Sequence, residues 1–221
     1  MEKDKDTYHT IDDPTEEVLF KDRKSKFYGL AFPVSDEEQI KEILTDLRKK
    51  YANANHVCYA WQLGTKTIIY RANDDGEPNN SAGMPIYGQI QAFEVTNILI
   101  AVIRFFGGTK LGVGGLISAY RTAAQQTLNS AKIVEKIITV RFSLQFGYPQ
   151  LDIVMRTIKQ NGFEIVSQEM HLDCQLTIQV REKEADRLQE YFEGLQGIEI
   201  KPIWNKPFGL ITLSFQEYNR G

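Results

Sequence analysis

The 221-residue sequence has little cysteine, no long apolar run and no large excess of charge. Its two cysteines, Cys58 and Cys174, are far apart in the chain, and we expect reduced thiols rather than a disulfide. The longest apolar run, Ile98–Ile103, is far too short to cross a bilayer. The first seven residues lack the apolar core of a secretory signal. We therefore expect a cytoplasmic protein that does not contact a membrane.

Several motifs that carry chemistry are also missing. A dinucleotide-binding loop around Gly112 needs a third glycine at position 117, which is Ile117, and a P-loop needs lysine at position 113, which is Val113. Zinc at His56 and Cys58 would need two more ligands, and the remaining candidates lie near the N-terminus or in the second half of the chain. We expect neither a cofactor nor a metal.

The most informative segment of the chain is Arg104–Arg121, RFFGGTKLGVGGLISAYR. It has five glycines in nine residues between an apolar strand and a helix, and such a turn leaves backbone N–H groups open to a flat or anionic group. The alternative is that the glycines only allow tight packing of strand and helix. The candidate residues for binding phosphate or RNA are Arg104, Gly107, Gly108, Lys110, Gly112, Gly114, Gly115 and Arg121.

The charge is unevenly distributed along the chain. The net charge is −3, but residues 104–160 carry eight Lys/Arg against two Asp/Glu, a balance of +6, while residues 1–103 and 161–221 are acidic. A local cationic patch on an acidic protein attracts phosphate groups. The alternative is an ordinary scatter of surface lysine and arginine.

A second candidate site combines a histidine with an acidic loop. Asp74, Asp75 and Glu77 lie within four residues, and together with His56 they could serve as acid and base in a small-molecule hydrolase if they converge. The alternative is that the carboxylates cap backbone N–H groups and order the loop. His56 and Cys58 alternate along a strand and so face the same side, where a packed histidine beside a buried thiol is the other interpretation.

The first part of the chain mixes helices and strands. Residues 1–16 are polar and acidic, and we expect them to be flexible. Ser35 and Glu38 form a capping box that predicts the start of a helix. Val57–Leu63 and Thr67–Tyr70 predict a hairpin, and Ile98–Phe106 a strand buried on both faces. Helices are predicted over residues 85–93 and 114–130.

After Lys136 the pattern starts again in the order β-α-β-β-α-β, which is the split βαβ arrangement of ferredoxin-like domains. We therefore expect an α+β chain of three parts: a flexible N-terminus over residues 1–16, a first domain over 17–134 and a second domain over 135–221. A further strand-like run, Leu210–Phe215, has no place in the six-element pattern.

The first domain resembles the IMPACT/YigZ family over about residues 15–130. The resemblance lies in His56-x-Cys58-x-Ala60, Asp74-Asp-Gly-Glu-Pro78, Ala82-Gly-x-Pro85 and Arg104-x-Phe-Gly-Gly-x-Lys-Leu-Gly-x-Gly-Gly-Leu. It implies a first domain similar to ribosomal protein S5 domain 2 and a ferredoxin-like second domain, a pair like the last two domains of translocating elongation factors. Eukaryotic members regulate translation under stress. The family pattern usually has tyrosine where this chain has Phe105.

These observations favour a translation-related regulatory protein that binds RNA or a ribosome-associated partner, rather than an enzyme. The small-molecule hydrolase is the alternative. A third hypothesis is a protein-interaction module acting through the second domain, which predicts an exposed apolar sheet face there. The sequence leaves the oligomeric state open.

Overall fold

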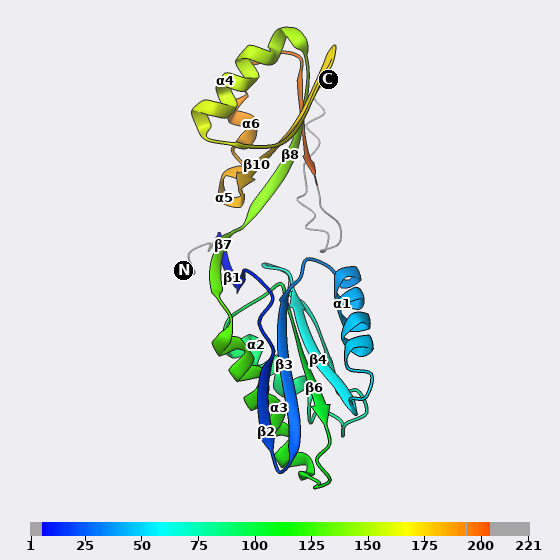
Figure 1. Ribbon diagram of the computed structural model, residues 1–221. Coiled ribbons are helices and arrows are strands. Elements are labelled where there is room, and N and C mark those ends of the chain that lie inside the picture. Colours follow the sequence, from blue (N-terminus) through cyan, green and yellow to red (C-terminus); the bar gives the residue numbers. More distant parts are fainter. Residues whose placement is uncertain (1–5, 193, 204–221) are drawn as a thin grey trace, which may run out of the picture.

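The computed structural model describes residues 6–192 and 194–203, which form an α+β protein with two larger sheets (Figure 1). The first sheet has five strands, and every neighbouring pair is antiparallel. Its order is β2 (Val18–Asp22), β3 (Ser25–Pro33), β6 (Ile98–Phe105), β4 (His56–Leu63) and β5 (Ile69–Asn73).

Helices cover both faces of this sheet. Helix α1 (Glu37–Lys50) lies on one face, and α2 (Gly83–Ala92) and α3 (Gly112–Ser130) lie on the other (Figure 1). The central strand β6 is buried from Ile98 to Arg104, which confirms the prediction of a strand covered on both faces. No helix among the described residues is long and apolar enough to span a membrane.

Helix α1 begins one residue later than the capping box predicted. Asp36 is the N-cap, and its carboxylate accepts a hydrogen bond from the Gln39 N–H at 2.8 Å. The Gln39 side chain in turn accepts from the Ser35 N–H at 2.9 Å. The cap therefore combines two side chains: Asp36 accepts from the Gln39 N–H, and Gln39 reaches back to the N–H of Ser35, the residue before the N-cap. Asp36 can replace the predicted serine because a carboxylate accepts from a helix N-terminus at least as well as a serine hydroxyl does.

Part of the segment that was expected to be flexible forms a strand. Strand β1 (Thr7–Ile11) pairs antiparallel with β7 (Ile133–Ile137), which follows α3 in the chain. Thr10 and Ile11 are buried, and the His9 carbonyl accepts a hydrogen bond from the Thr96 N–H at 2.9 Å. Pairing and burial of these side chains outweigh the polar composition of the surrounding residues.

The second sheet has four antiparallel strands in the order β11-β8-β10-β9. It is built from β8 (Thr139–Gly147), β9 (Glu164–Met170), β10 (Asp173–Arg181) and β11 (Ile198–Ile203), with a short 3-10 helix η1 (Tyr148–Gln150), α4 (Leu151–Asn161), α5 (Glu182–Ala185) and α6 (Leu188–Tyr191). The predicted order of elements is thus present. Helix α4 ends at Gly162, whose φ of 68° is left-handed, as the Asn161-Gly162 stop signal predicted. The predicted strand Leu210–Phe215 lies outside the described residues.

The open face of the second sheet is polar. One face packs against α4 and α6 through buried residues such as Leu144, Leu176 and Ile178. Residues that alternate with these, including Gln145, Gln175 and others along the same strands, are exposed or only partly buried. The third hypothesis, which required an exposed apolar sheet face, is therefore not supported by the described part of this sheet.

Candidate functional site

One end of the five-stranded sheet gathers most of the motifs found in the sequence. At this end β6 leads into the glycine turn, β2 turns into β3, β4 begins, and the acidic loop follows β5 (lower end of Figure 1). The strand register brings them together, since His56 lies opposite Arg104 and Lys26 lies opposite Phe105. Segments far apart in sequence therefore share one edge of the molecule.

The glycine turn is open to solvent. Gly108, Lys110, Gly112 and Gly114 are exposed, and Gly108 and Gly112 have φ of 86° and 72°, a backbone conformation that favours glycine. Helix α3 begins at Gly112 without a side-chain cap and without an acidic residue in its first turn. A Cβ added at Gly114 would meet no atom within 4 Å. The first backbone N–H groups of α3 are thus accessible and uncapped by side chains.

Gly107 has a different role from the other glycines. A Cβ added there would lie 2.0 Å from the carbonyl carbon of Lys24 and 2.4 Å from the backbone nitrogen of Ser25. The Gly107 N–H also donates to Ser25 Oγ at 3.2 Å. The packing interpretation therefore holds for Gly107, which allows the glycine turn to lie directly on the β2–β3 turn. Gly115 is intermediate, since its added Cβ would meet only Leu111 Cβ at 3.0 Å.

Two of the three predicted cations face solvent. Lys110 lies in the turn and Arg121 on α3, both exposed, and neither takes part in an ion pair within the described part of the chain. Arg121 follows Gly114 by seven residues, so it lies on the same helix face about 10 Å further along the axis. The start of α3 and these two side chains can therefore contact one extended anionic ligand.

Arg104 is not available to such a ligand. It is only 5% exposed, and its Nη1 lies 2.5 Å from Glu77 Oε1. Its guanidinium lies near two aromatic rings, with the central carbon 5.5 Å from the Phe27 centroid and 5.6 Å from the Phe106 centroid. The expectation that the Arg104 side chain is available to attract phosphate is therefore wrong. Arg104 lies opposite Phe27 in the sheet, and this position turns its side chain toward the face covered by α2 and α3.

Glu77 is the centre of a buried polar cluster. Besides Arg104, it accepts a hydrogen bond from the Tyr120 hydroxyl at 2.8 Å, and its Oε1 lies 3.9 Å from His56 Nε2. Cys58 Sγ lies 3.3 Å from Tyr120 Oη and 3.0 Å from the Asp74 carbonyl oxygen. Burial raises the pKa of both the Cys58 thiol and the Tyr120 phenol, so neither ionises near neutral pH. Cys58 is thus a packed thiol rather than a nucleophile.

The other two carboxylates of the acidic loop order the backbone. Asp74 Oδ1 accepts from the N–H groups of Ala82 and Gly83 at 2.9 and 2.8 Å, and so caps α2. Asp75 Oδ2 accepts from the Val57 N–H at 2.6 Å, and its other oxygen pairs with Arg48. The capping interpretation therefore holds for Asp74 and Asp75. Of the three predicted carboxylates, only that of Glu77 lies beside His56, and no metal-ligating cluster of three His, Cys, Asp or Glu occurs among the described residues.

The β2–β3 turn is a part of this surface that the sequence analysis missed. Lys24 in this turn and Lys26 near the start of β3 are exposed. They line a cleft of about 320 Å³ with Tyr28, Phe105 and Phe106, directly beside the glycine turn. The basic run of residues 21–26 was a visible signal, but its position depends on the order of strands in the sheet. By contrast, two lysines of the +6 segment, Lys132 and Lys136, pair with Asp12 and do not add to this surface.

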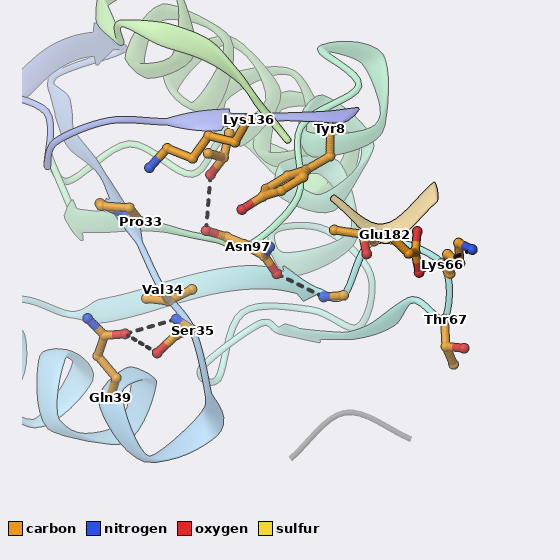
Figure 2. A pocket seen from close by; sticks show the side chains of 13 residues that line it. Tyr8, Pro33, Val34, Ser35, Gln39, Lys66, Thr67, Asn97, Lys136 and Glu182 are labelled. Atoms are coloured by element: carbon orange, nitrogen blue, oxygen red, sulfur yellow. Dashed lines mark hydrogen bonds and ion pairs between the residues drawn. The ribbon is translucent and has the colours of Figure 1, made fainter. Parts of the chain in front are cut away.

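A larger cavity lies at the opposite end of the sheet. It has a volume of about 500 Å³ and is lined by the β1–β7 pair, the start of α1, the β4–β5 turn and Glu182 (Figure 2). Several of its polar groups already bond to one another: Asn97 Oδ1 accepts from the Gly64 N–H, and Lys66 pairs with Glu182 at 3.1 Å. None of the predicted site residues lines this cavity.

The segment that contains these motifs matches a known protein family. Residues 23–128 match the Impact N-terminal domain. The IMPACT family member YvyE of Bacillus subtilis is 29% identical over 86% of this chain and 87% of its own length, and an IMPACT family member of Haemophilus influenzae is 30% identical over 77% of this chain and 84% of its own length.

Two solved structures are also similar. The crystal structure of a hypothetical protein covers 91% of this chain and 99% of its own, with 23% identity and a TM-score of 0.66. The structure of the two-domain translational regulator Yih1 matches 53% of this chain and 46% of its own, with 28% identity and a TM-score of 0.37. The sequence is similar to these bacterial relatives over most of their length, and the fold of the similar crystal structure is shared. This chain therefore belongs to the IMPACT family.

Proposed function

We propose that this protein acts in translation by binding RNA or a ribosome-associated partner through one surface at the end of the five-stranded sheet. We call it the glycine-turn surface, and it consists of Gly108, Lys110, Gly112, Gly114, Gly115 and Arg121 with the neighbouring Lys24 and Lys26. The observation that carries the proposal is the exposed, uncapped start of α3 between cations that have no ion-pair partner among the described residues.

The chemistry of this surface suits phosphate. The N-terminus of a helix carries a partial positive charge and free N–H donors, which together favour an anion. Lysine and arginine add attraction that does not depend on base sequence, because phosphates carry the charge of every nucleotide. Glycine at positions 112 and 114 lets the ligand approach the backbone closely. The Lys110 and Arg121 side chains would then hold successive phosphates along one strand.

The link to translation comes from the relatives. Yih1 is described as a translational regulator, and the resemblance to the family implies that its eukaryotic members act in translation under stress. We extend this role to the present chain, together with two finer structural assignments: a first domain over residues 17–134 similar to ribosomal protein S5 domain 2, and a ferredoxin-like second domain over residues 135–221. The β11-β8-β10-β9 order and the helices on one face support the second assignment.

Affinity capture from a lysate of the expression host tests this role. The wild-type protein should retain ribosomal material, and nuclease treatment should release it if RNA is the partner. Lys110→Ala/Arg121→Ala should retain much less, whereas the control Lys41→Ala/Lys159→Ala, which removes the same charge from exposed positions on α1 and α4, should retain as much as wild type. Equal capture by both double variants would contradict the proposed surface.

The hydrolase alternative is favoured by one observation, the 3.9 Å separation of His56 Nε2 and Glu77 Oε1. Against it, Glu77 is 8% exposed and already bonds to Arg104 and Tyr120. A screen with chromogenic phosphate and carboxylate esters distinguishes the two. We expect no turnover above that of His56→Asn, and turnover that this substitution abolishes would favour the hydrolase.

A further inference from the structure

The cleft beside the glycine turn combines charge with aromatic surface. Lys24 and Lys26 form its cationic part, and Tyr28, Phe105 and Phe106 form its apolar part. Phe106 directly follows β6, whose residues Ile98 to Arg104 are buried, yet it is 46% exposed, which is unusual for a phenylalanine. The 320 Å³ volume is at the lower limit of small-molecule sites and suits a single planar ring.

The aromatic side chains of the cleft are held in place by their neighbours. The Phe106 N–H donates to Asn55 Oδ1 at 2.8 Å, and the buried Arg104 guanidinium lies 5.6 Å from the Phe106 ring centroid. Phe105 meets Tyr28 edge to face, with centroids 5.7 Å apart. Binding therefore needs little ordering of these rings, which lowers its entropic cost.

From this arrangement we infer that the cleft stacks an unpaired base of single-stranded RNA, while Lys24 and Lys26 contact the phosphates beside that base. The inference rests on the proposed function and adds to it the form of the RNA. Aromatic side chains stack on any base because every base has a π face, and the stacked base must be free of a duplex to reach them. The two lysines complement the phosphates that accompany each base. A purely apolar partner would leave these lysines unpaired.

The start of α3 and the cleft then bind different parts of the RNA. The start of α3 with Lys110 and Arg121 binds backbone phosphates and does not distinguish single strands from duplexes. The cleft binds a base and so favours the single strand. Because Gly107 packs the glycine turn directly onto Lys24, neighbouring nucleotides of one strand can occupy both parts.

Fluorescence anisotropy with a labelled 12-nucleotide single strand and the matching RNA duplex tests the inference. Wild type should bind the single strand more tightly. Phe106→Leu should weaken single-strand binding roughly tenfold, with little change for the duplex and an unchanged salt dependence. The control Tyr70→Leu removes another exposed aromatic residue, on β5, and should bind both RNAs as wild type does.

The outcomes separate this inference from the proposed function. If Lys110→Ala/Arg121→Ala weakens binding while Phe106→Leu does not, the phosphate surface stands and the base-stacking cleft is refuted. If wild type binds neither RNA at low salt, RNA binding itself is refuted and a protein partner remains. Thermal unfolding of Phe106→Leu shows whether the variant is folded.

Ultraviolet cross-linking gives a second measurement that needs no variant. Irradiation of wild type bound to a uridine-rich single strand should attach uridine to the tryptic peptide Phe105–Lys110, which follows cleavage at Arg104 and contains Phe105 and Phe106. Cross-links confined to peptides that do not line the cleft would overturn the inference.

Discussion

Glu77 is the residue on which the buried cluster depends. It is the only acidic partner of the Arg104 guanidinium among the described residues, and it also accepts from Tyr120. We predict that Glu77→Gln lowers the free energy of unfolding by about 3 kcal/mol, because a buried guanidinium loses its counter-charge. Urea unfolding measures this loss. Glu42→Gln, at an exposed position of α1, is the control and should change stability by less than about 0.5 kcal/mol.

A folded Glu77→Gln variant also separates structure from binding. The Glu77 side chain lies below the surface and does not belong to the glycine-turn surface. RNA affinity measured well below the unfolding temperature should therefore match wild type. A large loss of affinity in a fully folded variant would show that the cluster takes part in binding directly.

The Cys58 thiol gives the stability a defined dependence on pH. Burial raises its pKa in the folded chain, while in the unfolded chain the pKa returns to about 8.5. Above about pH 9 the unfolded chain therefore loses a proton that the folded chain keeps. The free energy of unfolding should fall with rising pH, by up to about 1.4 kcal/mol per unit from this group, and should not change on its account below pH 8.

Comparison with Cys58→Ala isolates this contribution. Cys58→Ala also removes the contact between Cys58 and Tyr120, but burial is the largest cause of the raised Tyr120 pKa, so Tyr120 should stay protonated in both folded proteins. The change of their stability difference with pH then reports Cys58. Urea unfolding at pH 7, 9 and 10 should show the advantage of wild type shrinking as the pH rises. A difference that stays constant across this range would mean that the thiol ionises equally in both states.

At the scale of elements, the glycine turn contains residues with opposite roles. Gly107→Ala would force a Cβ into the backbone of Lys24, and we predict a loss of roughly 1–3 kcal/mol as the β2–β3 turn and the glycine turn move apart. Gly114→Ala is the matched control: its Cβ enters open space in the first turn of α3, and it should be neutral or stabilising by up to about 1 kcal/mol. Thermal unfolding measures both, and equal effects would contradict the distinction.

The elements themselves were largely predictable, because they depend on local patterns. The burial of β6, the end of α4 at Gly162 and the element order of the second sheet followed from hydrophobic periodicity and turn residues. Strand β1 was missed because it is short and lies in an acidic segment, and its stability comes from pairing with β7, more than 120 residues away. Such pairing has no local signal.

At the scale of the whole molecule, the sequence predicts which residues lie in the glycine turn but not which of their side chains are exposed. Lys110 and Arg121 are exposed, as binding requires, whereas the burial of Arg104 depends on which face of β6 its side chain occupies. The position of Lys24 and Lys26 depends on β3 lying next to β6 in the sheet. The burial of Arg104 and the position of the two lysines both depend on tertiary structure. They cannot be predicted from the distribution of charges along the chain.

The salt dependence of RNA binding tests the central claim most directly. Each phosphate contact on a single strand contributes about −0.7 to the slope of log affinity against log salt concentration. Wild type should therefore bind at low salt with a clearly negative slope, and Lys110→Ala/Arg121→Ala should reduce the slope by about 1.4 while Lys41→Ala/Lys159→Ala leaves it unchanged. Absence of binding at low salt, or an affinity indifferent to salt, would contradict the account.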